Sequence, residues 1–151
     1  MISEAVGAPA HRNIGGVEYE FHPLRIKHMG YIEQWMKDST LRQARDIIRE
    51  IPDATEKDKA RILEEAYKTC SRLNFGSPQA EMFLGSVAGL HQMIWQSMRQ
   101  GREITLQQVE DLICTRELVI EIGEVVMNIS GLSEDQPIPF PQSSSESVQK
   151  T

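Results

Sequence analysis

Cysteine is scarce in this sequence, with Cys70 and Cys114 the two representatives among 151 residues. They lie far apart and in no metal-ligand spacing, whereas a disulfide framework would need more cysteines at short intervals. We therefore expect two reduced thiols in a cytosolic setting.

Long apolar runs are also missing. No uninterrupted apolar stretch approaches the roughly 20 residues that a membrane helix needs. Residues 1–5 (MISEA) contain no basic segment followed by an apolar core, so no secretory signal is expected. Together these absences predict a soluble protein with no membrane partner.

The sequence has no excess of positive charge. Its 16 basic and 22 acidic side chains give a formal net charge of −6, which argues against a protein that neutralises duplex phosphates. Arg42, Arg45 and Arg49 are a local exception, because their spacing lines one side of a helix. That stripe could hold an acidic partner or RNA, but a solvated helix face is the preferred interpretation.

Hydrophobic residues make up 40% of the chain, enough for the core of one domain of ordinary size. Residues 1–12 are small and polar and are expected to be flexible. Val17, Tyr19 and Phe21 then alternate with glutamates, the period of a half-buried strand, and Gly15-Gly16 is a turn signal before it. We expect a short β-hairpin that lies on the helical body or pairs with another chain, since a lone hairpin is marginal in water.

From residue 24 the apolar spacing becomes helical. A first helix is expected over residues 24–37, and the Asp-Ser-Thr cluster at 38–40 is expected to cap a second one that ends at Pro52. Asp53 and Glu56 make a plausible capping box for a third helix that reaches about residue 73. The buried stripe of the second helix would be formed by Leu41, Ala44, Ile47, Ile48 and Ile51.

Two longer helices are expected next. Ser77-Pro78 is a strong helix start, and that helix should run to residue 100; within it, Gly85 and Gly89 would permit close helix approach. Thr105 and Gln108 form a capping box for the last helix, which should reach residue 130 and stop at Gly131. In its second half a narrow polar stripe is surrounded by apolar residues, as in a helix that is buried on several sides. The polar stripe consists of Glu117, Glu121, Glu124 and Asn128.

The composition changes again after Leu132. Three prolines and a run of serines describe a tail, residues 133–151, that cannot bury enough apolar surface to fold alone. The sequence as a whole predicts a mainly α-helical protein: a small bundle of about five helices with a short N-terminal β-hairpin, one domain over residues 13–132, and a disordered C-terminal tail.

The sequence contains no recognisable catalytic or metal-binding constellation. None of the four histidines has a carboxylate, cysteine or second histidine at ligand spacing on a shared helical face, and His91 is interpreted as a satisfied, partly buried histidine. Cys114, beside Arg116, could be an activated thiol, but a buried cysteine is the ordinary interpretation. We expect no catalytic residue, no metal and no cofactor, and hence a binding protein and not an enzyme.

Several short segments are similar to a known family. They are GVEYEFHPL at residues 16–24, GYIEQW at 30–35, GLHQMIW at 89–95, ITLQQVEDLI at 104–113 and NISGL at 128–132. Over roughly residues 14–132 the chain resembles the tail assembly chaperones of tailed bacteriophages, which are made just upstream of the tape measure protein. The resemblance implies a non-enzymatic role in the host cytoplasm, with the tape measure protein as partner.

A chaperone of this kind would need adaptable apolar surface and several copies, so self-association is expected. The first candidates for partner or subunit contact are apolar side chains of the last two expected helices, although all of them could instead be intramolecular core. Two other roles stay open: a structural virion protein such as an adaptor, connector or tail component, and a small host-directed regulator that uses the arginine stripe. The contact candidates are Phe83, Val87, Leu90, Ile94, Val119, Ile122 and Val126.

Overall fold

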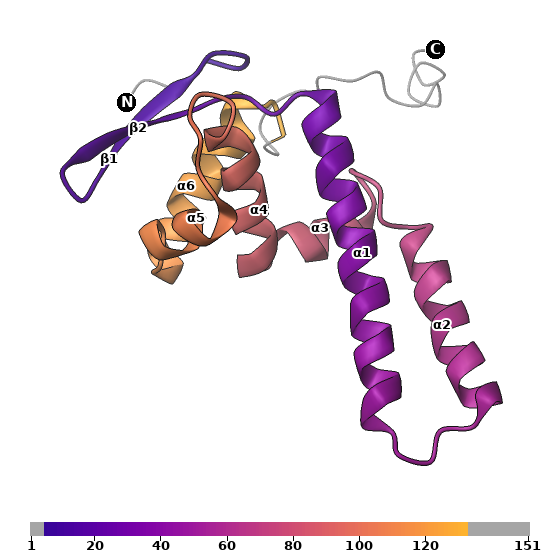
Figure 1. Ribbon diagram of the computed structural model, residues 1–151. Helices are drawn as coiled ribbons and strands as arrows, with labels where there is room; N and C mark the ends of the chain where they lie inside the picture. Colours follow the sequence, from indigo (N-terminus) through magenta and orange to yellow (C-terminus); the bar gives the residue numbers. More distant parts are fainter. Residues whose placement is uncertain (1–4, 133–151) are drawn as a thin grey trace, which may run out of the picture. The chain divides into compact units, whose positions relative to one another are not determined.

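A computed structural model describes residues 5–132 of the chain, and the predicted disordered tail over 133–151 lies outside this part. Within it, two strands and six helices follow in the order β1, β2, α1 to α6 (Figure 1). The mainly helical prediction with an N-terminal hairpin is confirmed. The domain expected over 13–132 divides into two compact units, one formed by the described residues before residue 26 and from Leu90 onward, the other by Ile26–Gly89.

The hairpin pairs β1, Ala10–Ile14, with β2, Val17–Phe21, in antiparallel register around the Gly15-Gly16 turn. Both glycines have positive φ, 63° and 86°, as a tight two-residue hairpin turn requires. β1 begins inside the segment expected to be flexible, because Phe21 at the far end of β2 pairs with Ala10. This corrects the flexible segment 1–12 at its C-terminal end.

The hairpin lies on the helices of its own unit, as expected for a sheet too small to be stable alone. The hydroxyl of Ser97 donates to the carbonyl oxygen of His22 at 2.7 Å, and the backbone N–H of Leu24 donates to Ser130 Oγ at 2.8 Å. Nearer the N-terminus, Gly7 N–H donates to the Ile129 carbonyl at 2.7 Å. Phe21 is completely buried.

One long helix, α1 (Ile26–Glu50), replaces the two helices expected up to Pro52. The predicted cap at residues 38–40 lies in the middle of this helix. Asp38 accepts a hydrogen bond from Gln34 at 2.9 Å, and the Thr40 hydroxyl donates to the Met36 carbonyl at 2.9 Å. These side chains make their hydrogen bonds within the helix, as threonine and serine side chains in helix interiors commonly do. The helix therefore continues through residues 38–40.

α2 (Glu56–Cys70) runs antiparallel beside the second half of α1 (Figure 1). Its capping box is formed by Thr55 and Asp58, two residues beyond the expected pair Asp53 and Glu56. The Thr55 hydroxyl accepts from Asp58 N–H at 3.1 Å, and the Asp58 carboxylate accepts from Thr55 N–H at 3.3 Å. The presence of a capping box at the start of this helix is confirmed, whereas the predicted pair of residues is wrong.

The helix expected over residues 78–100 is broken into α3 (Pro78–Leu84) and α4 (Val87–Met98). Its start is confirmed, since Ser77 caps α3 and Pro78 is the first helical residue. The break falls at Ser86, whose hydroxyl donates to the Phe83 carbonyl at 2.5 Å and accepts from Gly89 N–H at 3.1 Å. The chain turns so tightly that a Cβ on Gly89 would lie 2.3 Å from the Phe83 oxygen, so glycine is required there.

The last expected helix is also two, α5 (Leu106–Leu112) and α6 (Arg116–Ile129). The Thr105 and Gln108 capping box of α5 is confirmed, while Thr115 supplies an additional cap that starts α6. α6 ends at Ile129, and Gly131 is the stop residue as predicted: it has φ of 74°, and Leu132 N–H donates to the Met127 carbonyl at 2.8 Å. This is the hydrogen-bond pattern of a Schellman motif.

α4 and α6 supply most of the core of their unit. Met93, Ile94 and Met98 on α4 and Ile122, Val126 and Ile129 on α6 are each at most 1% exposed. Gly123 lets the two helices approach, because a Cβ there would lie 2.8 Å from the Leu90 side chain. No helix within residues 5–132 is long and apolar enough to cross a membrane.

Candidate functional site

The contact candidates chosen from the sequence are mostly core residues. Leu90, Ile94, Val119, Ile122 and Val126 are between 0% and 7% exposed, so they offer no surface to a partner in this conformation. Their spacing indicated apolar faces correctly, but those faces are covered by the other elements of the same unit. The polar stripe of α6 is placed as predicted, with its three glutamates exposed.

Two contact candidates lie outside that core. Phe83 is half-buried, with its ring edge-on to Trp35 at a centroid distance of 5.1 Å. Val87, at the start of α4, is 51% exposed. Val87 is therefore the one member of the predicted set with a large accessible apolar surface.

The arginine stripe of α1 is accessible to solvent. Arg42, Arg45 and Arg49 are all exposed, and Arg49 pairs with Asp46 one turn earlier at 3.2 Å. An exposed pair of this kind contributes little to stability. The solvated-face interpretation fits this placement.

Large apolar side chains that remain exposed concentrate in the unit Ile26–Gly89. Ten such side chains occur among the described residues, and seven of them belong to this unit. For those on α1 and α2 the reason is architectural: the two helices form a hairpin, which can cover one face of each helix but leaves the flanks open. The seven are Ile26, Tyr31, Ile47, Ile51, Tyr67, Met82 and Val87.

Between α1 and α2 lies an open groove of about 350 Å³. Ala44 and Ala66 are buried at its floor, while Ile47 is 49% exposed and Ile62 is half-buried. Arg61 and Glu65 on the α2 wall carry opposite charges, so the lining has no net charge. Its exposed area is mostly apolar. The full lining is Thr40, Gln43, Ala44, Ile47, Arg61, Ile62, Glu65, Ala66 and Thr69.

The sequence did indicate this stripe, but as buried core. Ala44 is 3% exposed as expected, whereas Ile47 and Ile51 are 49% and 41% exposed. Helical periodicity shows which side chains share a face, but it does not show whether a third element covers that face. The groove is the apolar surface that sequence reasoning missed.

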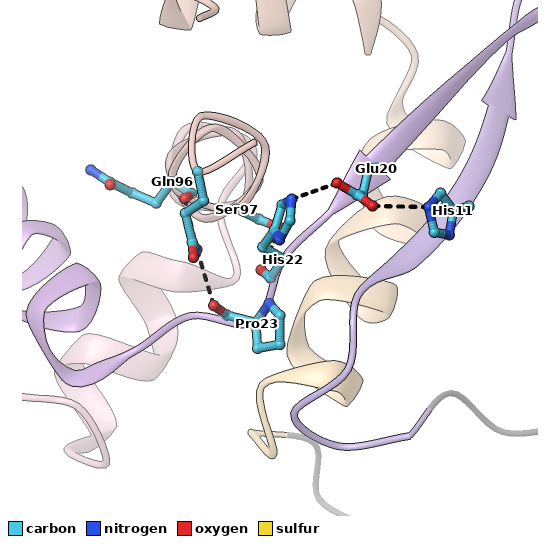
Figure 2. A network of polar contacts seen from close by, with 7 residues as sticks. His11, Glu20, His22, Pro23, Gln96 and Ser97 are labelled. Carbon is cyan, nitrogen blue, oxygen red and sulfur yellow. Dashed lines mark hydrogen bonds and ion pairs between the residues drawn. The ribbon is translucent and has the colours of Figure 1, made fainter. Parts of the chain in front are cut away.

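A polar network in the other unit was also missed (Figure 2). Glu20 lies between two histidines: its Oε2 is 3.0 Å from His11 Nε2, and its Oε1 is 2.8 Å from His22 Nε2. His11 and Glu20 are directly opposite in the hairpin register. Their proximity could therefore be inferred from strand pairing, but not from helical spacing. Gly101 makes room for the His22 ring, which a Cβ would meet at 2.4 Å.

We interpret this network as structural, because it links β1, β2 and the residue that follows β2. The side chains of His11 and Glu20 are 50% and 44% exposed, so water screens their interaction. Beside it, Gln100 Nε2 donates to the Pro23 carbonyl at 3.0 Å, which ties the end of α4 to the chain after β2. Among residues 5–132, no three His, Cys, Asp or Glu side chains are placed to hold a metal ion together.

The remaining reactive side chains are a histidine and the two cysteines. His91 is buried, and its Nε2 lies 2.7 Å from the Ile113 carbonyl, which confirms a satisfied histidine. Cys114 is exposed and not buried as expected, because it falls in the short connection between α5 and α6. Cys70 is buried, and this burial raises the pKa of its thiol above the ordinary value.

Comparison with known proteins adds no functional assignment to this geometry: no protein-family model, no curated protein and no solved structure matches the chain.

Proposed function

We propose that this chain is a non-enzymatic tail assembly chaperone of a tailed bacteriophage, and that it binds the tape measure protein in the host cytoplasm. The assignment to this family rests on the sequence resemblance over roughly residues 14–132. The structural support is for the physical activity that such a role requires, which is reversible binding of another polypeptide through apolar surface.

The open groove between α1 and α2 is the observation that carries the proposal. It combines a buried floor at Ala44 and Ala66 with the accessible side chain of Ile47, and its lining has no net charge. Contact with a partner would remove this apolar surface from water, which is favourable by roughly 25 cal/mol per Å². The surface is small, so each contact is weak, and several copies would hold a long client together.

Exposed apolar side chains elsewhere in the same unit suit a chaperone that must accept different segments of a client. Met82 is 80% exposed and Tyr67 is 58% exposed. Methionine adapts its shape to different neighbours, and tyrosine contributes both apolar area and a hydroxyl. These positions extend the surface on which a client could be held.

The direct test is co-expression of the full chain with the tape measure protein encoded in the same genome. We expect a larger soluble fraction of the tape measure protein with the native chain, and a smaller gain with Ile47→Gln. Ile120→Gln is the matched control, because Ile120 on α6 is 40% exposed and lies outside the groove lining. Equal solubility with and without the chain would contradict the proposal.

Mass spectrometry of purified virions separates the chaperone from the alternative of a structural virion protein. A chaperone that leaves after assembly should be absent from the particles. Stoichiometric recovery of the chain in virions would replace the proposal by that alternative.

A further inference from the structure

We propose that the groove between α1 and α2 takes one amphipathic α-helix of the client and excludes extended segments. This inference rests on the proposed function for the identity of the client, but its argument comes from the chemistry of the groove lining alone.

The hydroxyl groups of the groove are already engaged in hydrogen bonds. Thr40 Oγ1 donates to the Met36 carbonyl at 2.9 Å, and Thr69 Oγ1 donates to the Glu65 carbonyl at 3.1 Å. Each threonine therefore directs its proton to its own helix and not to a ligand. The backbone groups of both walls are likewise used within α1 and α2, as in any helix interior.

An extended segment would consequently lose hydrogen bonds on entering the groove. Each of its residues carries one backbone donor and one acceptor that need partners when they leave water. The lining offers three further polar side chains, Gln43, Arg61 and Glu65, all of them exposed. These cannot pair a continuous backbone, whereas a helix satisfies its own backbone groups and needs none from the walls.

The spacing of the lining also matches a helix. Thr40, Ala44 and Ile47 on α1 recur at i, i+4 and i+7, and so do Ile62, Ala66 and Thr69 on α2. Two such stripes side by side form the site for a third helix. The small floor residues allow an approach near the lower end of the usual range, roughly 8 Å between axes.

These dimensions define the ligand. α2 has 15 residues, which corresponds to a length of roughly 22 Å, so a client helix of about four turns would span the groove. Its contacting face should carry large aliphatic side chains such as leucine or methionine, because the floor is made of two alanines, Ala44 and Ala66. Its flanks should carry both signs of charge, to meet Arg61 and Glu65 on α2.

Two fluorescein-labelled peptides of identical composition, each roughly 15 residues long, provide the probe. In one, leucines recur at helical spacing; in the other, they alternate with polar residues as in a strand. We expect fluorescence anisotropy with the full chain to show at least tenfold tighter binding of the helical peptide. Circular dichroism should show a gain of helix when that peptide is mixed with the protein.

Two variants test the location of binding. Ile47→Gln should weaken the helical peptide about fivefold, since it removes roughly half of the contribution of a buried isoleucine. Ile120→Gln, outside the groove, should bind as the native chain does, and far-UV circular dichroism of each variant verifies its fold.

Several results would overturn the inference. They are no binding of the helical peptide at hundreds of micromolar protein, and equal or tighter binding of the alternating peptide. A concentration-dependent dimer in sedimentation velocity that Ile47→Gln abolishes would assign the groove to a second copy and overturn it as well. Helical-peptide binding by a chain that fails to solubilise the tape measure protein would uphold the groove and refute only the proposed function.

Discussion

Replacement of Gly89 by alanine is expected to destabilise the chain, although alanine is the better helix former. The added Cβ would lie 2.3 Å from the Phe83 carbonyl oxygen and 2.8 Å from Leu84 Cα. The first distance is about 1 Å shorter than an ordinary carbon–oxygen contact of roughly 3.3 Å. Both obstructing atoms belong to the backbone at the end of α3, so relief requires the turn itself to open.

The expected size of the effect follows from two opposing contributions. Forced overpacking costs typically 1–3 kcal/mol, or more where backbone must move, and the gain in helix propensity returns at most about 1 kcal/mol. We expect Gly89→Ala to lose about 2 kcal/mol of unfolding free energy. In a chain of this length that loss lowers Tm by roughly 4–8 °C.

Gly30→Ala is the matched control, since Gly30 lies within α1 and a Cβ there would meet nothing within 4 Å. That variant should gain about 0.5–1 kcal/mol. Urea denaturation followed by circular dichroism at 222 nm measures both variants. If Gly89→Ala proved as stable as Gly30→Ala, the close approach that we assign to the Ser86 turn would be refuted.

Three further predictions concern the core, a helix cap and the thiols. Ile122→Ala should cost about 2–4 kcal/mol because Ile122 is completely buried, whereas Ile120→Ala, at a position 40% exposed, should cost less than about 1 kcal/mol in the same denaturation assay. Thr115→Ala removes the cap of α6, whose hydroxyl accepts a backbone N–H at 3.2 Å, and should cost about 1 kcal/mol; an unchanged midpoint would exclude a capping role. Iodoacetamide should modify exposed Cys114 well before Cys70, because burial raises the pKa of the Cys70 thiol and limits access to it, and mass spectrometry showing equal rates would contradict this placement. The raised pKa of Cys70 also means that the folded state favours the protonated thiol. The stability that this thiol contributes should therefore be present below the ordinary thiol pKa and be lost as the pH rises through the raised pKa of the folded state.

Helix starts and stops were predictable where one local signal had no competitor. Ser77 before Pro78, Thr105 with Gln108, and the glycine at position 131 each act as their sequence patterns indicate. In each case the residues that satisfy the orphan backbone groups lie within a few positions of the helix end. Local chemistry is then sufficient to place the boundary.

Helix boundaries were missed where a threonine hydroxyl can form either of two local hydrogen bonds. Thr40 bonds back to the carbonyl four residues earlier and leaves α1 unbroken, whereas Thr115 accepts from a backbone N–H three residues later and starts α6. Both are threonines in apolar-periodic surroundings, and packing decides between the two bonds. Sequence periodicity therefore identified the helical faces but merged or divided helices wrongly.

The candidate site was misplaced for a related reason. Apolar spacing selected the faces of α4 and α6, where residues such as Ile94 and Val126 are fully buried. The accessible face belongs to α1 and α2, where Ile47 follows the same spacing but is 49% exposed. Burial depends on which elements meet in three dimensions, and that information is not contained in one periodic stripe.

The division of the chain into a continuous unit, Ile26–Gly89, and a discontinuous one has a consequence for its synthesis. On the ribosome, the continuous unit has all of its residues once Gly89 has emerged, and its short-range helical contacts can form at once. The hairpin must wait longer, because Gly7 bonds to Ile129 and Leu24 bonds to Ser130. Between Gly89 and Leu132 the ribosome adds 43 residues (132 − 89), which takes roughly 2–9 s at about 5–20 residues per second. During that interval β1 and β2 have been made, but the residues at the end of α6 to which the hairpin segment bonds have not.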